Sequence, residues 1–132
     1  MLHISRSLSL IAFMAIALLI LPSKSWAADP PEGIDAMVVA EWPVDIPGIE
    51  KMQLRRVEFQ PGATIELAIT HVEFCNGTQG EWAVTIPEGG KTTVHTAGGR
   101  WRMPPPGTKI SITNPGNIPA VQFVYRLIEK KM

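Results

Sequence analysis

Cysteine is nearly absent from the chain: Cys75 is the only one in 132 residues. A disulfide within the chain is therefore excluded, and with it the class of small secreted domains that are held together by several disulfides. A solitary thiol in an oxidising compartment is buried and inert, paired with a second chain, or kept for its chemistry. The sequence leaves these three alternatives for Cys75 open.

The chain also lacks an excess of positive charge, because twelve Lys and Arg balance twelve Asp and Glu. A surface that binds phosphate groups needs clustered positive charge. The basic residues instead form scattered pairs, Arg55-Arg56, Arg100/Arg102 and Lys130-Lys131. We therefore do not expect nucleic acid to be a partner.

Long hydrophobic runs are missing except for one, which extends from Leu8 to Leu21. It follows the basic residue Arg6 and measures 14 residues, fewer than the ~20 that a membrane-spanning helix needs. The small residues of Ser25-Trp26-Ala27 lie where a signal peptidase cleaves. We expect residues 1–27 to be a secretory signal peptide. The mature chain is then secreted or periplasmic, with no membrane contact after cleavage.

The 3.6-residue periodicity of amphipathic helices is absent after residue 27. Residues 28–50 are rich in proline, which favours an extended N-terminal arm with one short strand, Ala36–Trp42. Residues 51–132 alternate between β-branched or apolar runs and turns of Gly, Pro and Asn, which predicts a single all-β domain. With the arm strand, about eight strands close a barrel or jelly roll. The other expected strands are Met52–Phe59, Thr64–Cys75, Glu81–Ile86, Thr92–Thr96, Arg100–Met103, Lys109–Thr113 and Val121–Ile128.

Two segments resemble the two motifs of the cupin superfamily of jelly-roll barrels. In the second, Pro105, Gly107 and Asn114 keep the spacing P-x-G-x2-H-x3-N. In the first, FQPGATIELAITHVEFCNGTQGEWAVTI, Gly62 and Gly80 match the opening and closing glycines of G-x5-H-x-H-x3,4-E-x6-G. The resemblance implies a cupin barrel, and a homodimer is a further expectation from it.

The same resemblance implies that the usual cupin metal centre is missing. Cupins hold a divalent metal with three histidines and one glutamate, and the three histidine positions are occupied here by Ala68, Thr70 and Ile110. Six residues separate Glu73 from Gly80, as the motif requires, but Glu73 comes one residue too soon after Thr70. We therefore expect no cofactor.

A second candidate site follows from strand alternation. In a single strand over Thr64–Cys75, the side chains of His71, Glu73 and Cys75 share the face of three large aliphatic residues, which indicates the barrel interior. Imidazole, carboxylate and thiolate suit a divalent transition metal. Three alternate residues of one strand do not converge on an ion unless a bulge bends the chain. Structural roles remain the alternative: a buried His71, and a Glu73 paired with Arg55 or Arg56.

The leading hypothesis is an exported cupin-like domain that binds a small molecule or a partner protein without the family metal, with no catalysis required. One alternative is a metal-dependent oxygenase, isomerase or lyase that uses His71, Glu73 and Cys75. Another is a structural or redox protein that acts through Cys75. The candidate ligand pocket consists of His71, Glu73, Cys75, Trp101, Met103 and Ile110. Trp82, Trp101 and Met103 either line the interior or fill the core, and filling the core is the default interpretation.

Overall fold

The computed structural model describes residues 31–131, so the expected signal peptide, residues 1–27, lies outside the described part. Residues 31–131 form strands joined by turns and contain no helix, which confirms the all-β prediction. No helix that could cross a membrane occurs among them. The nine strands are β1 (Ile34–Ile46), β2 (Ile49–Phe59), β3 (Thr64–Ala68), β4 (Val72–Gln79), β5 (Glu81–Ile86), β6 (Lys91–Thr96), β7 (Arg100–Arg102), β8 (Lys109–Thr113) and β9 (Ala120–Glu129).

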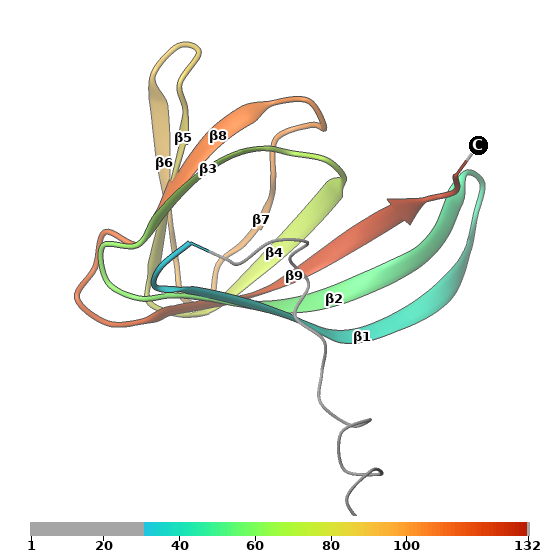
Figure 1. Cartoon of the computed structure of the whole chain (residues 1–132), viewed down its shortest axis with the longest axis horizontal. Helices are drawn as coiled ribbons and strands as arrows, with labels where there is room; N and C mark the ends of the chain where they lie inside the picture. The colour runs from blue at the N-terminus through green and yellow to red at the C-terminus, as the bar shows by residue number, and fades with distance from the viewer. Residues whose placement is uncertain (1–30, 132) are drawn as a thin grey trace, which may run out of the picture.

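Two antiparallel sheets face each other and enclose the core (Figure 1). One sheet has the order β1-β2-β9-β4-β7 and the other the order β3-β8-β5-β6. Phe59 of the first sheet packs edge-on against the fully buried Trp82 of the second, with 4.8 Å between ring centroids. Such aromatic pairs stabilise by about 1 kcal/mol beyond the apolar area that they bury. Trp82 therefore belongs to the core, as its default interpretation required.

From Ile34 on, the proline-rich segment belongs to the first sheet and does not form a separate arm. β1 is longer than the expected strand Ala36–Trp42, and it pairs with β2 from Ile34 opposite Phe59 to Ile46 opposite Ile49. Pro43 lies next to a register shift in this edge strand. An edge strand tolerates proline because one side of its ladder forms no hydrogen bonds.

The expected continuous strand Thr64–Cys75 is wrong. The chain leaves β3 after Ala68 and enters β4 at Val72, in the opposite sheet. At the corner, Ile69 N donates to Thr108 O at 2.9 Å, and Gly107 N donates to Ile69 O at 2.8 Å. Because residues 69–71 turn from one sheet to the other, the alternation of side chains does not continue through them.

Asn114 ties the loop after β8 to the end of β2. Its side chain is fully buried, and Nδ2 donates to Phe59 O at 3.0 Å and to Ile118 O at 2.8 Å. Oδ1 accepts from Gly116 N at 2.9 Å. Three backbone groups therefore depend on one buried amide, which explains an asparagine at this motif position.

Gly80, the closing glycine of the first motif, occupies a tight turn between β4 and β5. Its φ is +74°, and a Cβ there would lie 2.9 Å from both Ala120 Cα and Pro119 O. Gly80→Ala is expected to cost about 2 kcal/mol more than Gly89→Ala, because both replacements carry the strain of a positive φ but only the first meets backbone atoms. Gly89 has φ +91° and open space around it. Urea unfolding measures both variants, and equal losses would contradict the expectation.

Candidate functional site

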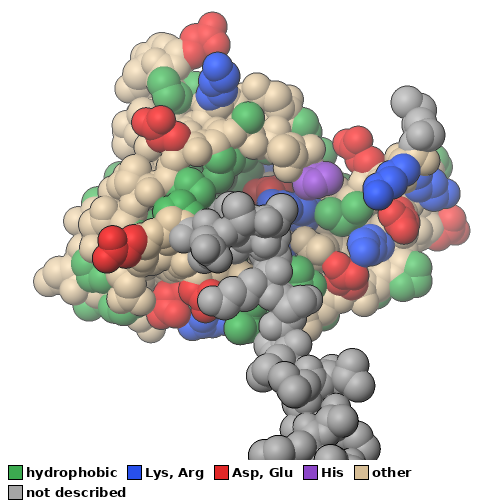
Figure 2. Space-filling view, viewed as in Figure 1, with side chains coloured by type: hydrophobic (Ala, Val, Ile, Leu, Met, Phe, Trp, Pro, Cys, Tyr) green, Lys and Arg blue, Asp and Glu red, His purple; other side chains and the backbone are tan. Residues whose placement is uncertain are grey.

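A cavity of about 440 Å³ lies between the two sheets. Figure 2 shows the hollow in this face of the molecule, with acidic and basic side chains among hydrophobic ones. Strands β2, β3, β4, β8 and β9 and the corner at residues 69–70 supply most of its wall. The lining residues are Arg55, Val57, Phe59, Ile65, Leu67, Ala68, Ile69, Thr70, Glu73, Cys75, Met103, Ile112, Gln122, Val124 and Arg126.

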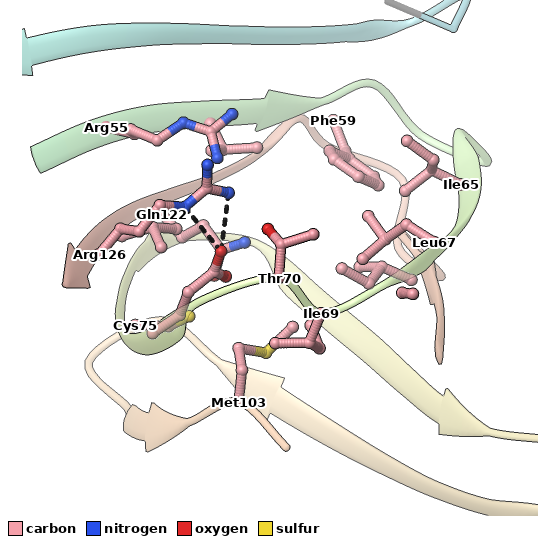
Figure 3. Close-up of a pocket in the computed structure, with 15 residues that line it drawn as sticks. Arg55, Phe59, Ile65, Leu67, Ile69, Thr70, Cys75, Met103, Gln122 and Arg126 are labelled. Carbon is pink, nitrogen blue, oxygen red and sulfur yellow. Dashed lines mark hydrogen bonds and ion pairs between the residues drawn. The ribbon is translucent and has the colours of Figure 1, made fainter. Parts of the chain in front are cut away.

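The two ends of the cavity differ in polarity. In Figure 3, Arg55, Gln122 and Arg126 gather at one end, while Phe59 and Leu67 lie at the other. Most of the remaining wall is aliphatic. An apolar cavity with a few convergent polar groups is typical of sites that bind small molecules.

An ion pair between Glu73 and Arg126 forms the centre of the polar end. Glu73 Oε1 accepts from Arg126 Nη2 at 2.7 Å and from Nε at 2.9 Å. The two residues lie opposite each other on β4 and β9. The ion-pair partner of Glu73 is thus Arg126 on β9, the strand between β4 and β2, and the structural alternative had placed Arg55 or Arg56 of β2 there. Glu73 is 8 % exposed, so the pair is largely desolvated.

Arg55 brings a second guanidinium to the same end. It is 6 % exposed, and burial, followed by the positive charge of Arg126, lowers its pKa to about 10, against the opposing effect of Glu73. Arg55 therefore remains charged at neutral pH. Two guanidinium groups and one carboxylate share a poorly solvated space.

The structure brings three of the six candidate pocket residues to the cavity. Glu73, Cys75 and Met103 line it. His71 belongs to the corner before β4, Trp101 stacks on His95 with ring centroids 4.2 Å apart, and Ile110 is part of the buried core. None of these three is among the lining residues.

Sequence reasoning missed Arg55, Gln122 and Arg126 as cavity residues. Strand alternation could have identified them, because residues two positions apart share one face of a strand. The two sets are Arg55, Val57 and Phe59 on β2, and Gln122, Val124 and Arg126 on β9. Each set projects from one face of its strand, and both faces point to the interior.

The residues of the cavity do not fit a cupin metal. Ala68 and Thr70, which the motif resemblance aligned with two family histidines, line the cavity and offer at most one hydroxyl. Between residues 31 and 131, no three His, Cys, Asp or Glu form a group that could hold a metal ion. The alternative centre of His71, Glu73 and Cys75 is therefore not assembled, because the chain turns at residues 69–71 and Glu73 is engaged by Arg126.

The Cys75 thiol is poorly suited to redox chemistry. It is 3 % exposed, and burial, with a smaller contribution from the charge of Glu73, raises its pKa far above the ordinary value. Because the thiolate is the reactive form, we expect no labelling of the native protein by 5,5′-dithiobis(2-nitrobenzoic acid) and labelling of one thiol per chain in urea. A non-reducing gel should show no disulfide-linked dimer. Fast labelling without denaturant would contradict this expectation.

The comparisons with known proteins identify the fold. No family model matches the chain, and no curated protein matches it significantly. Among solved structures, a Cupin 2 conserved barrel domain protein from Salinispora arenicola aligns with a TM-score of 0.56 and 19% identity, covering 70% of this chain and 74% of that one. The cupin_2 domain of an XRE family transcriptional regulator from Enterobacter cloacae aligns at 0.57 and 16%, covering 76% and 100%.

A third match comes from an enzyme. The polyketide cyclase RemF from Streptomyces resistomycificus aligns with a TM-score of 0.58 and 14% identity, covering 76% of this chain and 69% of that one. At sequence identities this low, the structural similarity establishes a shared fold only. The function has to be argued from the site. Nine antiparallel strands in two facing sheets, with these structural neighbours, show that the chain has a cupin-like fold.

Proposed function

We propose that the protein is an exported binding domain that takes a small organic ligand into the cavity between its sheets, without the metal of the cupin family. The observation that carries the proposal is the cavity itself. Its volume of about 440 Å³ falls in the range of about 300–1,000 Å³ that is usual for small-molecule sites. Its apolar wall favours a ligand with an apolar body, and its single polar end favours one orientation.

Binding fits the polar groups better than catalysis does. A general acid or base needs a carboxyl or imidazole group that is free to exchange protons with the substrate. Glu73 accepts two hydrogen bonds from Arg126, and the buried Cys75 has a raised pKa. The structural neighbours include both a regulator domain and a cyclase, so the fold alone favours neither role.

The ligand-binding proposal is tested with N-phenyl-1-naphthylamine, a neutral apolar probe whose fluorescence rises in apolar surroundings. We expect saturable binding of one probe per chain. Ala68→Trp should weaken it by about tenfold or more, because Ala68 lines the cavity and a large side chain there occupies the space. Ala97→Trp, in the turn before β7 and outside this cavity, is the control. Equal binding by the two variants, or no binding of this probe, of octanoate and of 1-octanol alike, would overturn the proposal.

The metal-free part of the proposal has its own test. Elemental analysis of protein purified without added metal should find no stoichiometric transition metal. Iron, zinc, copper, manganese and nickel should leave the melting temperature unchanged, because an ion that binds only the folded state must raise it. A stoichiometric metal that His71→Ala or Cys75→Ala removes would favour the metalloenzyme.

Export is proposed from the N-terminal sequence. The mass of the protein recovered from the medium or periplasm should match a chain that begins at Ala28, since cleavage is expected after Ala27. A full-length chain found in the cytosol would contradict export and leave the ligand-binding proposal unaffected.

A further inference from the structure

Resting on the proposed function, we propose that the ligand is a small organic anion with an apolar body, and that Arg126, beside Arg55 and Gln122, binds its negative group. Three polar residues at one end of the cavity, Arg55, Gln122 and Arg126, carry this inference, together with Glu73, which pairs with Arg126.

The charges of the cavity favour an anion. Among its described lining residues, Arg55 and Arg126 carry positive charge and Glu73 carries the only negative charge. A charge in a poorly solvated space is costly unless an opposite charge lies near it. Both guanidinium groups attract a ligand with a negative charge, whereas they repel a cation. Arg55 contributes through its charge alone, because this residue also interacts with another group.

Arg126 is placed to bind an anion directly. It donates to Glu73 through Nε and Nη2, and both bonds end on one oxygen. The guanidinium has five N–H donors, so Nη1 retains donors for a second acceptor. Its side chain is 21% exposed, more than that of Glu73, so a ligand can reach it. Hydrogen bonds between a guanidinium and a carboxylate are among the strong ones in proteins.

Gln122 adds an independent sign of a missing partner. It is 4 % exposed, it lines the cavity, and its Oε1 is buried without a hydrogen-bond partner among the described residues. An unsatisfied buried polar atom is destabilising, because it has lost its hydrogen bonds to water. Rotation of the amide presents either its oxygen or its NH2 group, so it can pair with a hydroxyl or with a carboxylate oxygen.

The opposite end suits an apolar body. Phe59, Ile65 and Leu67 face the cavity away from the two guanidinium groups in Figure 3. An alkyl chain or an aromatic ring placed there loses its contact with water, while the anionic group reaches Arg126. The cavity therefore matches a ligand that is charged at one end only.

Three probes of equal length test the charge preference: octanoate, 1-octanol and octylammonium. Isothermal titration calorimetry on the purified protein should give the tightest binding for octanoate, about tenfold tighter than for 1-octanol, as one charge-assisted contact provides. Octylammonium should bind most weakly.

Charge variants test the residue assignment. Arg126→Gln should weaken octanoate binding about tenfold and leave 1-octanol within twofold. Glu73→Gln should strengthen octanoate binding, because it removes the competing carboxylate. Arg55→Gln, which leaves the Glu73–Arg126 pair intact, replaces Arg126→Gln if that variant does not fold. Arg56→Gln is the control, since Arg56 pairs with Glu58 and lies outside the cavity.

The outcomes separate this inference from the proposed function. If 1-octanol binds as tightly as octanoate and the charge variants change neither, the preference for an anion is overturned and the binding function stands. If octanoate, 1-octanol and N-phenyl-1-naphthylamine all fail to bind, the proposed function itself fails.

Discussion

Replacing Asn114 with aspartate is expected to lower the free energy of unfolding by about 4 kcal/mol. The amide donates two hydrogen bonds, to Phe59 O and Ile118 O. A carboxylate has no proton to donate, so both carbonyl oxygens would face a negative charge in a fully buried position. The loss is a large part of the 5–15 kcal/mol that is typical of a domain.

Asn117→Asp is the matched control, because it makes the same chemical change three residues away on an exposed side chain. It should cost less than about 0.5 kcal/mol. Urea unfolding followed by tryptophan fluorescence measures both variants. The deficit of Asn114→Asp should shrink as the pH falls, since burial and the two facing carbonyl oxygens raise the pKa of the new carboxyl, and its protonated form can again donate. Equal costs for the two variants would contradict the role of Asn114.

Replacing Glu73 with glutamine is expected to cost about 3 kcal/mol, because it leaves Arg126 and Arg55 near each other without the carboxylate. Glu58→Gln removes the same charge from a second ion pair, with Arg56 at 3.3 Å. That pair is more exposed, with side-chain values of 36% and 26%, so its loss should cost less than about 1 kcal/mol.

A double-mutant cycle isolates the pair itself. Arg126→Gln in the Glu73→Gln background should cost less than it does alone, because the carboxylate that it would strand is already gone. Octanoate should raise the melting temperature of Glu73→Gln more than that of the unmodified protein, as a ligand that replaces the missing charge must. The interpretation fails if Glu73→Gln is no more destabilising than Glu58→Gln.

Much of the strand pattern could be predicted from the sequence, because turn residues mark its ends. The expected strands Glu81–Ile86 and Lys109–Thr113 agree with β5 and β8 to the residue. The corner at residues 69–71 could not be predicted in this way. Its residues, Ile69, Thr70 and His71, include no glycine or proline, and the bonds that hold it come from Gly107 and Thr108, far along the chain. Tertiary contacts decide its geometry.

The site was harder to predict than the fold for a related reason. The metal site predicted from His71, Glu73 and Cys75 required one continuous strand over Thr64–Cys75. The structure has two strands there, β3 and β4, in different sheets. The true polar end combines β2, β4 and β9, whose order in the sheet places Arg126 opposite Glu73. A charged residue in alternation with apolar ones is consistent with either face of a strand until its neighbours are known.

The corner at residues 69–71 has a mechanical consequence. It joins Leu67 on one wall of the cavity to Glu73 on the other through five intervening residues. A ligand that contacts both walls of the cavity connects the same two sheets as this short segment. Its arrival should therefore slow the separation of the layers, and amide hydrogens of β3 and β4 should exchange with solvent more slowly when the interior is filled.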